Sequence, residues 1–159
     1  MKNPKLLLIA IALICFGLLG AALYLQFVEY MQPCPWCIIQ RYLFTAIALI
    51  CLVSAFLPAK THRGGAGLGL LAALGGIGSA SWHLWVKAHP AVSCGLDPVE
   101  TSLNKFPTAK LLPFLFRPEG ECGTEYAPLF GLSIPQWSLL WFVVFAVVLG
   151  MLALRRQRR

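Results

Sequence analysis

Two cysteines separated by two residues, Cys34 and Cys37, are the residues whose spacing most directly suggests chemistry. Pro33 and Pro35 flank Cys34, and because proline pushes the residue before it toward an extended conformation, Cys34 belongs to a connector. Pro35 suits the first turn of a helix, so Cys37 is expected in that turn, at the positive end of the helix dipole. This position favours the thiolate, which is the reactive form of cysteine.

Arg41 follows four residues after Cys37 and is expected on the same helix face, one turn deeper. A cation just inside an apolar segment is costly and usually has a reason. The simplest alternative is that Arg41 extends back to the membrane surface. A Cys-x-x-Cys pair can also be half of a structural zinc site. The combination indicates a redox centre at a membrane surface, and no metal ligands are predicted.

The elements that must position these residues are membrane helices. Of 159 residues, 58% are hydrophobic and 12% are charged, whereas a soluble domain averages about 25% charged residues. Four apolar runs are long enough to cross a bilayer, and the length of the first favours an uncleaved helix over a signal peptide. We predict an all-α membrane protein, a four-transmembrane-helix bundle forming a single domain over residues 1–159. The predicted spans are about 6–28, 35–57, 66–86 and 136–154.

The segment 87–135, between the third and fourth spans, is predicted to be a long connector without secondary structure, and such connectors are usually functional. Within it, residues 103–116 mix aromatic and aliphatic side chains with lysines and prolines, as expected for a segment that lies on the membrane. The third span carries small residues at about every fourth position, which predicts close helix packing. His83, near the end of that span, is interpreted as either a structural or a functional histidine.

Basic and acidic residues lie on opposite sides of the predicted membrane. The N-terminus, the connector 58–65 and the C-terminus hold basic residues and no acid, while all six acidic residues lie on the other side. The positive-inside rule therefore places both termini in the cytoplasm. The basic residues on that side are Lys2, Lys5, Lys60, Arg63, Arg155, Arg156, Arg158 and Arg159. This asymmetry accounts for the net charge of +7 without a nucleic-acid partner.

Four of the six cysteines are expected on the outward face, and in a bacterium this face is the periplasm, where disulfides form and persist. They are Cys34, Cys37, Cys94 and Cys122. Cys15 and Cys51 fall inside predicted helices and are expected to be buried thiols. Two structural disulfides are conceivable, but a Cys-x-x-Cys pair closes too short a loop to stabilise much. Chemistry is the better use of that pair.

Several motifs occur together along the chain. They are Cys34-Pro35-Trp36-Cys37 with Arg41, then His83 and Pro90 ahead of Cys94, the further cysteine Cys122, and Ile134-Pro135-Gln136-Trp137 at the start of the last span. In this combination, with four spans and both ends inside, the chain resembles the disulfide bond formation protein B (DsbB) family. The members of that family are quinone-dependent thiol oxidases of the bacterial inner membrane.

The resemblance implies a relay of electrons. Cys94 and Cys122 would form the disulfide that accepts electrons from a reduced thioredoxin-fold oxidase similar to DsbA, with Cys94 as the residue attacked. Cys34 would then exchange with Cys122, and Cys37 would pass the electrons to a ubiquinone or menaquinone held near Arg41 and His83. Two alternatives remain, a non-enzymatic membrane interaction protein stapled by disulfides and a zinc-binding membrane module that uses the four outward cysteines.

Overall fold

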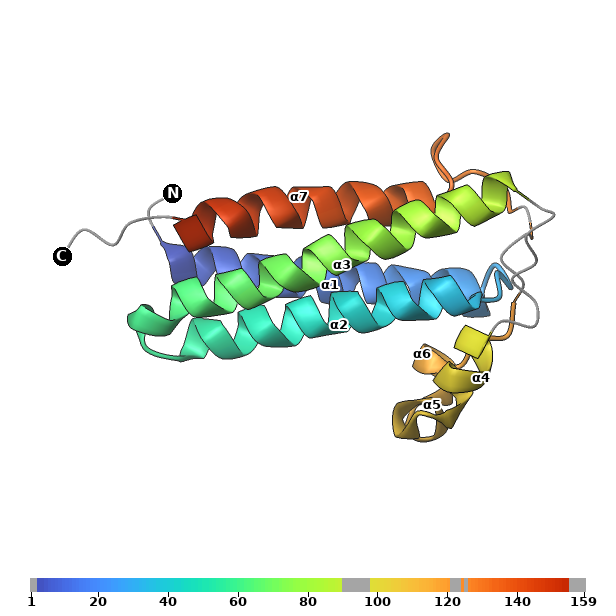
Figure 1. Cartoon of the computed structure of the whole chain (residues 1–159), viewed down its shortest axis with the longest axis horizontal. Coiled ribbons are helices and arrows are strands. Elements are labelled where there is room, and N and C mark those ends of the chain that lie inside the picture. Colours follow the sequence, from blue (N-terminus) through green and yellow to red (C-terminus); the bar gives the residue numbers. More distant parts are fainter. Residues whose placement is uncertain (1–2, 90–97, 121–123, 125, 155–159) are drawn as a thin grey trace.

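The structure is a computed structural model, and it describes residues 3–89, 98–120, 124 and 126–154. Four of its helices are long and apolar enough to cross a membrane, which confirms the predicted four-helix architecture. They are α1 (Pro4–Phe27), α2 (Pro35–Phe56), α3 (His62–Ala88) and α7 (Ile134–Leu154). They lie side by side, with the start of α1 and the end of α7 at the same end of the bundle (Figure 1).

The third helix is longer than the sequence indicates. It begins at His62, directly after a 3-10 turn η1 (Ala59–Thr61), whereas the predicted span begins at residue 66. The first turn is retained because it packs closely on α2. His62 is buried, and a Cβ atom on Gly65 would collide with the side chain of Ser54. Glycine therefore serves here as a packing residue, while the sequence pattern alone is typical of a connector.

The predicted connector between α3 and α7 is not devoid of secondary structure, and that expectation is wrong. It contains three short helices, α4 (Pro98–Lys105), α5 (Pro107–Leu111) and α6 (Pro113–Phe116), which lie beside the N-terminal end of α2 (Figure 1). Each begins at a proline, whose fixed φ and missing N–H suit a first helical turn. The prolines therefore start helices here.

One face of these short helices is packed and the other is exposed. The buried side chains of Leu103 and Phe116 form an apolar cluster with Ile38 of α2. Phe106 and Leu111, in contrast, are more than half exposed, at 54% and 76%. Their contact with the membrane surface stays a prediction.

The core of the bundle depends on close contact between α3 and α7. Phe142 of α7 is fully buried and stacks on Phe44 of α2, with ring centroids 4.1 Å apart and planes at 9°. Its ring lies against the backbone of α3 at Gly76, where a Cβ atom would collide with it. Small residues thus let α7 approach α3, as the sequence predicts.

We expect Gly76→Ala to destabilise the bundle, because the added methyl group displaces the ring of Phe142. Overpacking of this kind costs about 1–3 kcal/mol, and the thermal unfolding midpoint in detergent should fall. Gly78→Ala is the matched control, since nothing lies within 4 Å of the Cβ position at Gly78. Equal unfolding midpoints for the two variants would contradict the assigned contact.

Candidate functional site

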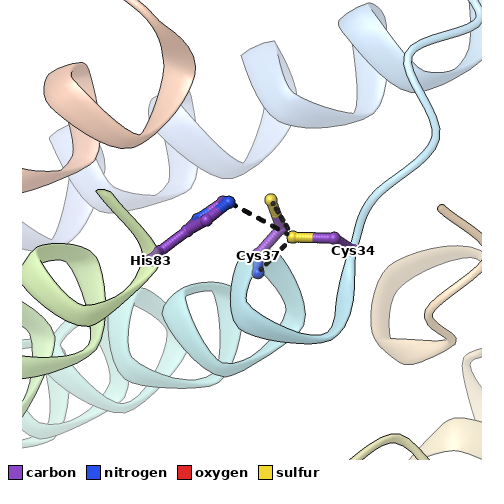
Figure 2. A group of neighbouring side chains, drawn as sticks. All are labelled: Cys34, Cys37 and His83. Atoms are coloured by element: carbon purple, nitrogen blue, oxygen red, sulfur yellow. Dashed lines mark hydrogen bonds between the residues drawn. The ribbon is translucent and has the colours of Figure 1, made fainter. Parts of the chain in front are cut away.

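Cys34 and Cys37 meet at the first turn of α2, as the sequence predicts. Cys34 is the N-cap residue, and its Sγ accepts a hydrogen bond from the backbone N–H of Cys37 at 3.4 Å. Both residues are free thiols, and Cys34 donates to the Sγ of Cys37 at 3.1 Å (Figure 2). This hydrogen bond, and then burial, raise the pKa of Cys34. Cys34 therefore keeps its proton and Cys37 is the acceptor.

His83 of α3 joins the thiol pair from the opposite side. Its Nε2 lies 3.5 Å from the Sγ of Cys34 (Figure 2). Its Nδ1 lies 3.4 Å from the Nε2 of Gln40. Both His83 and Gln40 are buried. Because a neutral imidazole has one donor and one acceptor nitrogen, donation from Gln40 to Nδ1 leaves the ring hydrogen on Nε2, pointing at Cys34.

Arg41 lies one turn below Cys37 and is only 6% exposed, so it does not extend back to the surface. Its Nη1 donates to the Oε1 of Gln26 at 2.8 Å and to the carbonyl of Leu115 at 3.2 Å, and its Nη2 donates to the carbonyl of Ala22 at 3.3 Å. A guanidinium has five N–H donors, so two of them make no hydrogen bond with the described residues. Among those residues, no carboxylate pairs with Arg41.

An apolar cavity of about 330 Å³ opens beside these groups. Its polar lining consists mainly of Cys37, Arg41, His83 and their neighbours, and much of its apolar wall comes from α1 and α7. The volume lies at the lower end of the range for small-molecule sites, which are mostly apolar with a few fixed polar groups. The cavity is therefore suited to a small, mostly apolar molecule whose polar atoms face Arg41 and Cys37.

Comparison with known proteins places this chain in a family. The model of the family "Disulfide bond formation protein DsbB" matches residues 4–152. The chain belongs to the DsbB family. It is 60% identical over 157 residues to disulfide bond formation protein B of Herminiimonas arsenicoxydans, with 99% of each chain covered. It is also 45% identical to the protein of that name from Ralstonia nicotianae, over 99% of this chain and 98% of the relative.

The structure brings four of the six site residues predicted for this DsbB-family chain to one place, namely Cys34, Cys37, Arg41 and His83. Cys94 and Cys122 lie outside the described residues. Cys15 and Cys51 are fully buried in the bundle core, in agreement with the sequence analysis.

Several residues of this DsbB-family site were not identified from the sequence. Gln26 and Gln40 are buried polar residues within apolar helices, and that placement is the signal that was available. Lys87, Trp137 and Trp141 also line the cavity. They carry no comparable signal, because lysine and tryptophan are common at helix ends near a membrane surface.

The connector before Cys34 is hydrogen-bonded to residues that flank Cys122 in the sequence. The backbone N–H groups of Glu119 and Gly120 both donate to the carbonyl of Pro33 at 3.0 Å. The hydroxyl of Tyr126 accepts a hydrogen bond from the backbone N–H of Gln32, also at 3.0 Å. Residues on either side of Cys122 in the sequence are thus bound to the two residues that precede Cys34.

We expect iodoacetamide to alkylate Cys37 before Cys34 when the reduced, folded protein is treated at pH 7. Cys37 is partly exposed and accepts a hydrogen bond. Cys34 is 3% exposed, and its raised pKa keeps it as the thiol, so that its labelling should increase only at high pH. Mass spectrometry of the digested protein measures both rates. The buried Cys15 and Cys51 are internal controls and should react only after unfolding; faster labelling of Cys34 would contradict the assigned roles.

Proposed function

We propose that this DsbB-family protein oxidises a reduced thioredoxin-fold protein similar to DsbA and transfers the electrons to ubiquinone or menaquinone. The observation that carries the proposal is that Cys37 and the buried Arg41 line the same apolar cavity. A reactive thiol and a cation that pairs with no carboxylate in the described part of the chain then face a space that suits a quinone ring. The overall reaction converts a dithiol and a quinone into a disulfide and a quinol, so two electrons and two protons are transferred.

On the acceptor side, Cys37 is the nucleophile and Arg41 is the positive group. The two N–H donors of Arg41 that make no hydrogen bond with the described residues are available to an oxygen of the quinone, where negative charge develops as electrons arrive. The other three hydrogen bonds hold the guanidinium in place without help from the substrate. His83 contacts the sulfur of Cys34, so its first role is to orient the thiol pair. Because it also lines the cavity, its second role is to contact the quinone.

On the donor side, Cys94 receives the partner protein and Cys122 exchanges with Cys34. The hydrogen bond that Gly120 donates to Pro33 and the one that Tyr126 accepts from Gln32 support this order. Cys122 is two residues from Gly120 in the sequence, and a residue spans at most about 3.6 Å. Exchange between Cys34 and Cys122 is therefore within reach of the chain.

The protein crosses the membrane several times, and we assign it to the bacterial inner membrane with its thiols facing the periplasm. The distribution of charge in the sequence supports this orientation, as does the need for an oxidising compartment. In this orientation, Cys34, Cys37 and the short helices α4 to α6 lie at the periplasmic end of the bundle.

Arg41→Ala should reduce quinone use far more than it reduces stability. Loss of a hydrogen bond to a charged group costs on the order of 1.5–3 kcal/mol, or roughly tenfold to a hundredfold in a rate or affinity. The measurement is the loss of ubiquinone absorbance when purified protein is mixed with a reduced thioredoxin-fold oxidase, with thermal unfolding followed in parallel. Arg63→Ala is the matched control, because Arg63 lies at the opposite end of the bundle and only caps the carbonyl of Ala153. Unchanged quinone kinetics in folded Arg41→Ala would refute the role of Arg41.

The order of electron flow separates the proposed relay from a protein that is merely stapled by disulfides. A thioredoxin-fold partner lacking its second active-site cysteine should be trapped as a mixed disulfide on Cys94, because no thiol remains on the partner to resolve it. Non-reducing electrophoresis of membranes should show the adduct in the unaltered protein and in Cys15→Ala, and should show none in Cys94→Ala. An adduct that survives Cys94→Ala, or no adduct in any variant, would count against the relay.

Cys37→Ala should abolish quinone reduction while one electron pair is still accepted from the partner.

A further inference from the structure

We propose that the reduced Cys34–Cys37 pair and His83 also form a binding site for one soft divalent cation, such as Zn²⁺. The ion would hold the thiols out of disulfide exchange, so the site would be inhibitory and open only in the reduced protein. It differs from a structural zinc module built on the four outward cysteines, because its third ligand is a histidine of α3. The binding is independent of the proposed function, whereas its inhibitory consequence rests on that function.

The three donor atoms already lie close together. The two sulfurs and a ring nitrogen of His83 are within 4.8 Å of one another (Figure 2). Tetrahedral Zn²⁺ with ordinary bond lengths requires about 3.6 Å between sulfur and nitrogen and about 3.8 Å between sulfurs. The Cys34 sulfur and the His83 Nε2 are 3.5 Å apart, which already fits. The sulfurs are 3.1 Å apart, so the Cys37 side chain must rotate to separate them and bring its sulfur to the shared ion.

The histidine has the support that a metal ligand requires. A ligating imidazole normally donates its second N–H to a neighbouring acceptor, which fixes the ring. Gln40 occupies that position at Nδ1, at 3.4 Å, and is itself buried. When Nε2 binds a metal, the ring hydrogen moves to Nδ1, and rotation of the Gln40 amide presents Oε1 to accept it. Gln40 can therefore hydrogen-bond to the Nδ1 of His83 in both the metal-free and the metal-bound tautomer.

The fourth coordination position and the charge balance are also compatible with a cation. Cys34, Cys37 and His83 all line the cavity, so water or another small ligand can reach the metal from that side. Lys87 and Arg41 line it too, and their charges oppose a cation. Two thiolates offset the double charge of Zn²⁺, however, and binding releases the remaining thiol protons. Once the pair is oxidised to a disulfide, the thiolate ligands no longer exist and the site is lost.

Cobalt is the probe for the test, because Co²⁺ replaces Zn²⁺ in such sites and gives visible and near-ultraviolet absorption from thiolate ligands. Full-length protein carrying Cys94→Ser and Cys122→Ser, reduced in detergent without oxygen, should bind one Co²⁺, and added Zn²⁺ should displace it. His83→Ala should weaken binding at least tenfold. His89→Ala is the matched control, since His89 lies at the exposed end of the same helix and should have no effect.

Three results would overturn the site: no cobalt absorption in the reduced protein, equal affinity in His83→Ala, or binding that persists when Cys34 and Cys37 are oxidised. Gln40→Leu should weaken binding by about tenfold, as outer ligands of this kind typically do, while leaving the fold intact. In the protein with all six cysteines, Zn²⁺ should slow dithiol oxidation by quinone, and a chelator should restore it. Metal binding without inhibition would refute the inhibitory role alone, and an inactive metal-free protein would instead count against the proposed function.

Discussion

The buried guanidinium of Arg41 makes the interactions on which the part of the structure around the start of α2 depends. It belongs to α2, yet its hydrogen bonds go to Gln26 and Ala22 of α1 and to Leu115 of α6. One side chain thus fixes a neighbouring helix and the short-helix segment relative to the start of α2. Since no carboxylate among the described residues balances its charge, the site favours negative charge nearby. A buried cation of this kind is costly unless it has an anionic partner, and the thiolate and a reduced quinone are the two that the proposed reaction would supply.

The second constraint is the direction built into the thiol pair. Cys34 is buried, donates a hydrogen bond to Cys37 and lies beside His83, whereas Cys37 is partly exposed, and both cysteines line the cavity. Glu119 and Gly120, which precede Cys122 in the sequence, donate hydrogen bonds to Pro33, directly before Cys34. In the proposed relay, Cys34 exchanges with other thiols and Cys37 passes the electrons to the apolar acceptor. The two cysteines that carry these proposed roles lie less than one turn apart at the start of α2.

The sequence was sufficient to predict the four long helices, because each is a long apolar run, and to predict the start of α2, because Pro33 and Pro35 restrict the backbone. It also indicated Cys34, Cys37, Arg41 and His83, which the structure brings together at one cavity. It did not identify Gln26 or Gln40, since which buried amide meets which ring or guanidinium is decided by helix rotation and packing. For the same reason the glycines near residue 65 were interpreted as a connector, although contact with Ser54 continues the helix through them.

The features that suit this site to thiol oxidation also explain why it is open to a metal. A reactive dithiol needs two sulfurs in van der Waals range, a helix start that favours a thiolate, and a neighbour able to exchange a hydrogen bond with the partner sulfur. These are also the elements of half a zinc site, and His83 with its support from Gln40 adds a third ligand. The ligating residues themselves therefore cannot favour thiol oxidation over metal binding. That preference must come from Arg41 and Lys87, whose charges weaken cation binding, and from the oxidised state of the pair, in which both sulfurs are committed to each other.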